Sequence, residues 1–508
     1  MTTKNLMILG THSNAGKSIL VTALCRIFAQ DGYRVAPFKA QNMALNAGVT
    51  PDGHEIGRAT IAQAEAAGVK PHVDMNPILL KPEGHRRSQV VLNGKPYTHI
   101  DAGNWYSLKP FLWQQVTAAL DRLRQRYDLV IMEGAGSPAE INLKDGDIVN
   151  MRVAQYARSP VLLVGDIDRG GVFAALVGTM VLLEPDERAL VKGFVINKFR
   201  GDISLLGDGL RLLQARAFNI PTLGVIPYLL DIGVAAEDSV ALDEGQSSQV
   251  AGSRVDIAVI RLPRLSNFDD FDPLAAEPGV QVRFAERVAD LGQPNAIILP
   301  GSKMTLADLA WLRETGLARQ VMNLAQLGTP VVGICGGYQM LGHTLFDPDG
   351  VEAEPGAQVS GLGLLPIETI FTGDKRTEQV QAVLQAEVGP LAGLCGTPVT
   401  GYEIHMGRSQ SLEPAVPVLC RIGPAGASHF DGALSVDGRI WGTYLHGLFD
   451  NNALRHAWLR GLGWQGMGQS FDRERAYNRL ANHVRDHLDM EALRQIIGTD
   501  PSKLDDTL

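Results

Sequence analysis

Nine residues near the N-terminus, GTHSNAGKS from Gly10 to Ser18, have the composition of a loop that binds phosphate. The usual pattern is G-x-x-x-x-G-K-[ST], in which backbone N–H groups surround the phosphates, the lysine reaches the outer ones and the hydroxyl binds Mg²⁺. Here five residues rather than four separate Gly10 from Gly16, so the loop is one residue longer. We therefore expect a nucleotide site built from Gly10, Thr11, Gly16, Lys17 and Ser18.

Three acidic residues follow apolar stretches that are typical of buried strands. Glu133 comes at the end of the apolar run in YDLVIMEGAGS, and Asp166 and Asp168 lie in SPVLLVGDIDRGG, beside Arg169. Ligands of open α/β sheets gather at the carboxyl ends of the strands. We expect Glu133 to bind Mg²⁺, whereas Asp166 and Asp168 are either substrate-binding residues or a structural cluster with Arg169.

The stretch VINKFRGD places Asn197 after another apolar strand. In guanine-binding P-loop proteins an aspartate two residues after the lysine of this stretch reads the guanine edge, but here Arg200 has that position. The sequence therefore favours ATP over GTP, with the amide of Asn197 available to contact adenine.

A second chemical site is indicated by TPVVGICGGYQMLG, in which an apolar strand ends at Ile334 and Cys335 precedes two glycines. A nucleophile on a tight turn between a strand and a helix has this pattern, with cysteine in place of serine. The N-terminus of the following helix, which we expect near Tyr338, favours the thiolate form. The alternative is a cysteine that only fills buried apolar space.

A thiolate nucleophile needs a base. His446 ends the apolar stretch GTYLHGLF, and His405 in GYEIHMG is the rival. Gly301 and Ser302 form a turn after another apolar strand, in LPGSKMT, where a backbone N–H can stabilise an oxyanion.

The elements that must position these residues form two α/β series. Short apolar runs alternate with amphipathic helical stretches such as 16–30 and 112–126, which predicts parallel sheets covered on both faces. The polar segment 236–253, AEDSVALDEGQSSQVAGS, interrupts the series and reads as a linker. We predict a P-loop domain at 1–235, a second α/β domain at 254–450 and a helical segment at 451–508.

The composition excludes several classes of partner. A formal net charge of -9 provides no basic surface for nucleic acid or an anionic membrane. Four widely spaced cysteines contain no C-x-x-C pair, and no run approaches the ~18 apolar residues of a membrane helix. We expect a cytoplasmic protein that acts on small molecules, and the sequence does not indicate its oligomeric state.

Each half resembles a known group of enzymes. The lengthened loop is similar to that of the dethiobiotin synthetases, which use ATP to activate a carboxylate. The Cys335 region resembles the class I glutamine amidotransferases, which have a flavodoxin-like α/β fold and release ammonia from glutamine. The resemblance assigns Gln339 to substrate glutamine. The glutamate that usually follows the histidine by two residues is replaced by Leu448, so the residue that orients His446 is not evident.

The whole chain resembles the cobyric acid synthase family. The stretches that carry the resemblance include PFKAQNMALN, DIDRGGVFA, LPRLSNFDDFDPL, GICGGYQMLG and GYEIHMGR. Met304 departs from the family pattern, in which asparagine is expected. The resemblance implies amidation of carboxylates b, d, e and g of adenosylcobyrinic acid a,c-diamide to adenosylcobyric acid, with ATP, Mg²⁺ and L-glutamine.

Two alternatives remain at this point. Cobyrinic acid a,c-diamide synthase shares the two-part plan, although PFKAQNM and GYEIHMG favour the cobyric acid synthase family. A ParA/MinD-like ATPase switch is the other, but such proteins usually have an extra lysine early in the loop, where this chain has Thr11, His12 and Ser13.

Overall fold

The computed structural model describes residues 3–84, 87–101, 103–229, 255–414, 416–423, 428–468 and 470–499. The chain forms two compact units. Unit 1 comprises residues 1–44, 56–237 and 472–508, and unit 2 comprises 45–55 and 238–471. The predicted linker at 236–253 lies outside the described residues, and the predicted domain limits stay a prediction.

Unit 1 is built on a six-stranded sheet in the order β12-β11-β10-β1-β9-β2, and every neighbouring pair is parallel. Its strands are β1 (Lys4–Gly10), β2 (Val35–Phe38), β9 (Leu129–Glu133), β10 (Val161–Asp166), β11 (Val191–Phe199) and β12 (Thr222–Pro227). These are the apolar runs from which the sequence predicted buried strands, and the prediction of a parallel sheet is confirmed.

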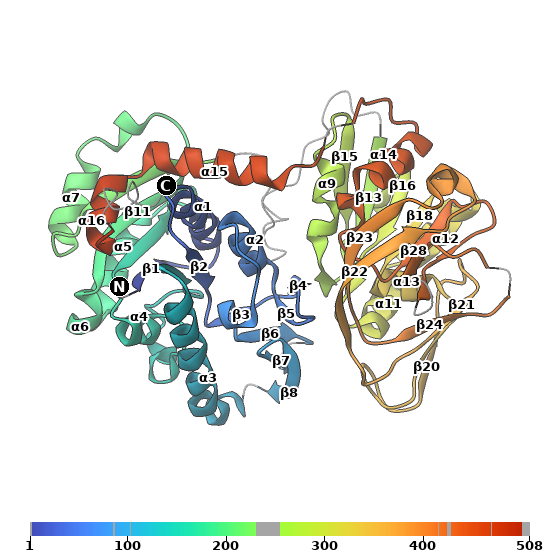
Figure 1. Cartoon of the computed structure of the whole chain (residues 1–508), viewed down its shortest axis with the longest axis horizontal. Coiled ribbons are helices and arrows are strands. Elements are labelled where there is room, and N and C mark those ends of the chain that lie inside the picture. The colour runs from blue at the N-terminus through green and yellow to red at the C-terminus, as the bar shows by residue number, and fades with distance from the viewer. Residues whose placement is uncertain are drawn as a thin grey trace. The chain divides into compact units, whose positions relative to one another are not determined.

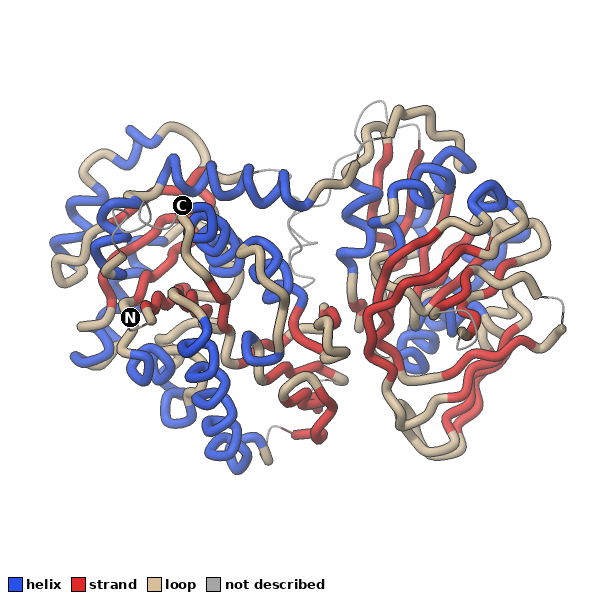
Figure 2. The backbone as a smooth tube through the Cα atoms, in the orientation of Figure 1, coloured by secondary structure: helices blue, strands red, loops and turns tan. Residues whose placement is uncertain are grey.

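Helices cover both faces of this sheet (Figures 1 and 2). Side chains alternate along β1, so Leu6 and Ile8 join one core while Met7 and Leu9 join the other. The helices are α1 (Lys17–Gln30), α2 (Arg58–Ala66), α3 (Trp105–Arg126), α4 (Met151–Ala157), α5 (Val172–Leu182), α6 (Pro185–Arg188), α7 (Gly209–Arg216), α15 (Arg473–His487) and α16 (Met490–Ile497). The predicted C-terminal helices therefore exist, and α15 and α16 pack into the core beside α1.

A smaller mixed sheet, β3-β6-β7-β8, completes unit 1. Its strands are β3 (Gln41–Met43), β6 (Ile78–Pro82), β7 (Arg87–Leu92) and β8 (Lys95–Asp101). Two further short strands, β4 (Ala47–Val49) and β5 (Glu55–Gly57), follow β3 in the chain, and β4 belongs to unit 2. Among the described helices of the whole chain, none combines the length and apolar character needed to cross a membrane.

Unit 2 has its own six-stranded sheet, β15-β13-β16-β18-β28-β27, in which only the last pair is antiparallel. The strands are β13 (Val255–Ile260), β15 (Val280–Ala285), β16 (Ala296–Leu299), β18 (Val331–Ile334), β27 (Ala433–Leu434) and β28 (Ile440–Thr443). The helices are α9 (Asp272–Ala275), α10 (Val288–Leu291), α11 (Thr305–Glu314), α12 (Leu317–Gln326), α13 (Gly336–Leu341) and α14 (Asn452–Gly461). The predicted second α/β series is confirmed.

The strands between β18 and β27 form additional sheets that the sequence pattern did not predict. They are β19 (Thr344–Asp347), β20 (Ala357–Ser360), β21 (Ile367–Ile370), β22 (Arg376–Leu384), β23 (Pro398–His405), β24 (Arg408–Ser411), β25 (Cys420–Ile422) and β26 (His429–Asp431). A further pair, β14 (Leu265–Ser266) and β17 (Gly301–Ser302), is antiparallel. The 3₁₀ turns η4 (Phe268–Phe271) and η6 (Leu448–Asp450) lie at the second site.

Candidate active sites

The glycine loop of unit 1 joins the end of β1 to the start of α1, as predicted. Gly16 has a φ of 95°, a left-handed conformation that favours glycine. A Cβ at this position would lie 1.9 Å from Nδ2 of Asn197. The loop therefore excludes any larger residue at position 16, and the next residue, Lys17, begins the helix whose N-terminus attracts anions.

Lys17 and Ser18 lie where the phosphate-binding pattern requires them. The Lys17 ammonium is buried and donates to the carbonyls of His12, at 3.1 Å, and Gly136, at 3.2 Å. The Ser18 hydroxyl donates to Oε1 of Glu133 at 2.7 Å. The structure thus brings the loop and the predicted acidic residue together.

Glu133 is buried at the end of β9 and has two further partners. Lys39 Nζ lies 2.8 Å from Oε1, and Gln63 Nε2 donates to Oε2 at 2.6 Å. Sequence reasoning missed both Lys39 and Gln63. The signal for Lys39 was its place directly after an apolar strand, where a buried lysine needs an anionic partner.

The donor set around Glu133 suits Mg²⁺. A hydroxyl and a carboxylate are hard oxygen ligands, and Mg²⁺ in nucleotide sites commonly takes one or two protein oxygens and completes its shell with water and phosphate. No cluster of three or more carboxylate, imidazole or thiol groups with metal-site geometry occurs in the described parts of the chain. The donor chemistry of Ser18 and Glu133 therefore fits a magnesium–nucleotide site.

Asp166 and Asp168 follow β10 but have different surroundings. Asp166 is buried, and its Oδ2 lies 3.2 Å from Nζ of Lys198. Asp168 is more exposed and pairs with Nε of Arg200 at 2.9 Å. Asn197 Nδ2 donates to the carbonyl of Ala15 at 3.0 Å, and this hydrogen bond stabilises the glycine loop.

In unit 2, Cys335 occupies the predicted turn between β18 and α13. Its φ of 50° and ψ of -109° are strained for a residue with a side chain, a feature concentrated at functional sites. A Cβ on Gly337 would lie 1.9 Å from the Leu299 carbonyl, and one on Gly336 would lie 2.9 Å from the Ser302 nitrogen. The two glycines are therefore required for the turn to pack against β16 and β17.

His446 is the base candidate that the structure places beside Cys335. It is only 2% exposed, and its Nδ1 lies 2.7 Å from Oδ2 of Asp270. The other Asp270 oxygen accepts the Gly447 N–H at 2.7 Å. Burial alone would lower the pKa of His446, but Asp270 and the hydrogen-bonded Cys335 side chain outweigh it and raise that pKa to about 10.

Asp270 supplies the acid that the sequence appeared to lack. Leu448, at the position of the usual glutamate, is buried in the apolar core. Asp270 instead comes from η4, 176 residues before His446 in the chain. The stretch SNFDDFDPL was noted in the sequence, but its spacing from His446 contained no signal that the two residues meet.

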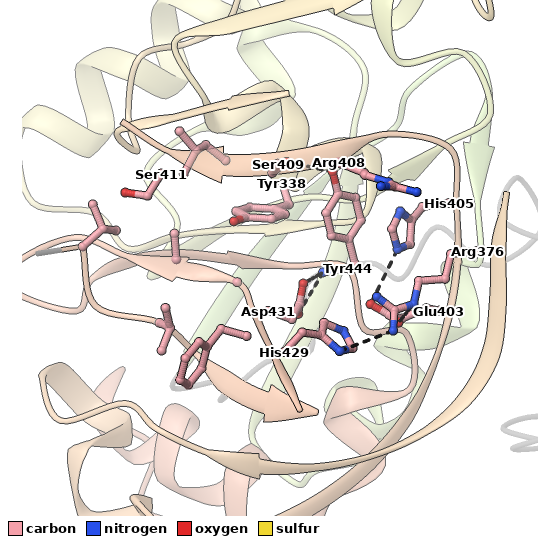
Figure 3. A pocket seen from close by; sticks show the side chains of 16 residues that line it. Tyr338, Arg376, Glu403, His405, Arg408, Ser409, Ser411, His429, Asp431 and Tyr444 are labelled. Carbon is pink, nitrogen blue, oxygen red and sulfur yellow. Dashed lines mark hydrogen bonds and ion pairs between the residues drawn. The ribbon is translucent and has the colours of Figure 1, made fainter. Parts of the chain in front are cut away.

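The rival histidine, His405, belongs to a different cluster (Figure 3). Its Nδ1 faces the Gly407 carbonyl at 2.9 Å, and its Nε2 lies 3.5 Å from Glu403. The ring stacks on Tyr444 with centroids 3.8 Å apart. This cluster lines a cavity of about 310 Å³.

The walls of that cavity carry opposed charges. The Arg376 Nε lies 2.9 Å from Glu403, and His405 and Arg376 lower the pKa of the Glu403 carboxyl although burial opposes this. Burial raises the pKa of the Asp431 carboxyl to about 6. Figure 3 shows these side chains on the cavity wall. His405 and His446 therefore differ in their carboxylate partners, which are Glu403 for His405 and Asp270 for His446.

Gly301 and Gln339 lie near Cys335 and His446. A Cβ on Gly301 would lie 3.2 Å from Cε1 of His446. Gln339 accepts from the Thr305 hydroxyl at 2.9 Å and donates to the Tyr444 hydroxyl at 3.3 Å. Gly301 and Ser302 form the short strand β17, paired with β14, and not the turn that the sequence predicted. A thiol, an imidazole, a carboxylate and an adjacent glycine backbone are the parts required for acyl transfer through a covalent thioester.

Comparisons with known proteins match both halves of the chain. Residues 6–240 match the CobQ/CobB/MinD/ParA nucleotide binding domain, and residues 256–454 match the CobB/CobQ-like glutamine amidotransferase domain. These matches agree with the phosphate loop in unit 1 and with the cysteine site in unit 2.

Full-length relatives are similar over nearly the whole chain. The cobyric acid synthase of Dehalococcoides mccartyi (strain CBDB1) is 52% identical over 97% of this chain and 99% of its own. That of Chloroflexus aggregans is 53% identical over 94% of this chain and 96% of its own. That of Yersinia enterocolitica is 50% identical over 97% of this chain and 98% of its own. The chain, a glutamine-dependent ligase of cobalamin biosynthesis, therefore belongs to the cobyric acid synthase family.

Proposed function

We propose that the enzyme converts adenosylcobyrinic acid a,c-diamide to adenosylcobyric acid by amidating carboxylates b, d, e and g. One L-glutamine and one ATP are consumed for each amide. The observation that carries this proposal is the presence in one chain of a phosphate loop with its buried acid and of a cysteine beside a histidine that is hydrogen-bonded to Asp270. The first suits activation of a carboxylate, and the second suits release of ammonia.

The glutamine reaction begins at Cys335. Its thiolate attacks the carbon of the glutamine side-chain amide, and the oxyanion forms beside the Gly301 backbone. Protonated His446 donates its proton to the departing nitrogen, so that ammonia leaves and a glutamyl thioester remains. His446 then takes a proton from water as the water hydrolyses the thioester to glutamate. Asp270 fixes the imidazole orientation through Nδ1.

The synthetase reaction uses the ammonia released from glutamine. A corrinoid carboxylate attacks the terminal phosphorus of ATP, which gives an acyl phosphate and ADP. Ammonia then displaces phosphate and forms the amide. Lys17 would stabilise the negative charge that develops on the phosphates, and Ser18 with Glu133 would hold Mg²⁺, which neutralises part of that charge. ATP is favoured because Arg200 stands where guanine recognition needs an aspartate and is held by Asp168.

The main test compares the two nitrogen sources. Cys335→Ala should lose glutamine-driven amidation but keep amidation from added ammonium, with the corrinoid product identified by mass. Retention of the glutamine reaction would show that Cys335 is not the nucleophile. Loss of the ammonium reaction in a folded variant would contradict the division of work between the two sites.

A second test addresses the acyl phosphate. Substrate carboxylates labelled with ¹⁸O should transfer label to the released phosphate, because the oxygen that attacks phosphorus leaves with it. Unlabelled phosphate would exclude this intermediate. A substrate preference for cobyrinic acid itself, read from the same mass spectra, would favour the a,c-diamide synthase alternative.

A further inference from the structure

The segment 45–55 lies in the synthetase half of the sequence but belongs to the compact unit that contains Cys335 and His446. It follows β3 and precedes α2 in the chain. Within unit 2, Asn46 of this segment contacts Asn267 of the SNFDDFDPL stretch. The function proposed above gives neither asparagine a role.

Both ends of the 45–55 segment are anchored in unit 2. At one end, Asn46 Oδ1 accepts the Asn267 N–H at 2.7 Å, and Asn267 Nδ2 donates to the Ala47 carbonyl at 2.8 Å. At the other end, Glu55 forms a buried ion pair with Lys375. Because Asn46 and Asn267 are both buried, loss of either side chain would leave polar backbone groups without a partner.

Asn267 begins the turn that carries Asp270. Its φ of 55° is left-handed, a conformation that asparagine tolerates better than most residues with a side chain. Its carbonyl accepts the Asp270 N–H at 3.1 Å. The Asn46 contact therefore fixes the residue on which η4 depends, and η4 presents the Asp270 carboxylate to His446.

Asn267 also contacts Tyr402, which stacks on the ring of His446. Asn267 Nδ2 also donates to the Tyr402 hydroxyl at 2.9 Å. The Tyr402 ring stacks on the His446 ring with centroids 5.3 Å apart and planes 21° apart. The two residues also exchange backbone hydrogen bonds of 3.1 and 2.9 Å. One asparagine thus contacts both groups that restrain the imidazole.

We propose that Asn46 and Asn267 are positioning residues for the glutamine-hydrolysing base, and that segment 45–55 completes this centre. The proposal rests on the proposed role of His446. Asn46 fixes the position of the Asn267 backbone. Asn267 in turn fixes the positions of Asp270 and Tyr402. These two residues hold the imidazole beside Cys335. Small displacements of a catalytic group lower the rate steeply, by ~10²-fold for about 1 Å.

The experiment uses the full chain and measures glutamate release, with kcat, KM and the pH profile, beside amidation driven by ammonium. Asn46→Ala should lower kcat for glutamine by about 10-fold or more, with a smaller change in KM, since the base is displaced and not the substrate pocket. Asp270, Tyr402 and Cys335 are the titratable groups that face His446. Weaker contact with Asp270 should move the alkaline limb of the profile to lower pH.

Two further variants distinguish a specific effect on the position of His446 from a general loss of stability in unit 2. Asn46→Gln keeps an amide oxygen that can accept the Asn267 N–H without burying a charge, and it should retain more of the rate than Asn46→Ala. Asn295→Ala is the matched control, because Asn295 Oδ1 accepts the Asp256 N–H at 2.8 Å elsewhere in unit 2 and contacts none of these groups in the described hydrogen bonds. It should leave glutamine hydrolysis unchanged.

The proposal is overturned if Asn46→Ala keeps the wild-type kcat and pH profile. It is equally overturned if Asn46→Ala loses ammonium-driven amidation to the same extent, or if Asn295→Ala has the same effect, since either result means a structural role only. Cys335→Ala is assayed in parallel. If that variant still hydrolyses glutamine, the proposed function fails, whereas an unchanged Asn46→Ala beside an inactive Cys335→Ala refutes the positioning role alone.

Discussion

Replacing Asp270 with asparagine is the sharpest test of the cysteine site. An ordinary histidine has a pKa of about 6.5, and the surroundings of His446 raise its pKa to about 10. That difference corresponds to ~5 kcal/mol in favour of the protonated ring. The charge and hydrogen bond of Asp270 are the main favourable contributions, and loss of one charge-stabilising partner in an active site typically costs ~10²–10³ in rate.

The amide introduces a second defect. Asparagine can present its NH₂ group to Nδ1, which favours the wrong tautomer of the imidazole, and this change in a serine-protease triad costs ~10⁴ in kcat. We therefore expect Asp270→Asn to lower kcat/KM for glutamine hydrolysis by ~10²–10⁴. Amidation from added ammonium should continue, because it does not use His446.

The pH dependence of glutamine hydrolysis tests the Asp270→Asn variant independently of its rate. His446 must be protonated to deliver a proton to the departing ammonia, so activity falls as pH rises through the pKa of His446. Asp270 raises that pKa, and its removal must lower it. The alkaline limb should therefore move from near pH 10 toward the ordinary range of histidine.

Asp256→Asn is the control for this experiment. It is also an acid-to-amide change in unit 2, at a residue that pairs with Arg283, and it should leave both the rate and the pH profile unchanged. If Asp270→Asn hydrolyses glutamine at the wild-type rate with an unmoved alkaline limb, the assignment of Asp270 as the third member of the site is wrong.

Three further outcomes are expected. Lys17→Ala should lower both glutamine-driven and ammonium-driven amidation by ~10²–10³ while glutamate release continues; selective loss of the glutamine reaction would contradict its role. Gly16→Ala should abolish nucleotide binding measured by calorimetry, since its Cβ would lie 1.9 Å from Asn197, whereas Gly178→Ala, with open space around that position, should bind normally. His405→Ala should retain far more glutamine hydrolysis than His446→Ala, and the reverse order would identify His405 as the base.

The features predicted correctly from the sequence are those that the chain encodes locally. The glycine loop and Cys335 each follow an apolar strand and precede a helix, so their geometry is contained within about twenty residues of sequence. Glu133 was identifiable because the carboxyl ends of parallel strands meet at one edge of the sheet, and β9 pairs directly with β1.

The features missed depend on packing between distant segments. Gln63 reaches Glu133 from α2, and the sequence contains no periodic signal that this glutamine faces the strand end. The sequence pattern predicts a first domain that is continuous over 1–235, and that limit stays a prediction, whereas the compact units group 45–55 with unit 2. The anchoring contacts of segment 45–55 to Asn267 and Lys375 join residues more than two hundred positions apart, which no pattern of spacing reveals.

The substitution at position 448 illustrates why chemistry is a better guide than motif order. A triad needs a hydrogen-bonding partner at Nδ1 of the imidazole, but it does not need that partner to follow the histidine in the chain. Leu448 packs into the apolar core, where an ionised glutamate would need a partner to offset its desolvation. Asp270 meets the requirement from η4, where the Gly447 N–H also stabilises it. A missing motif residue therefore argues against a triad only after the space around the other ring nitrogen has been inspected.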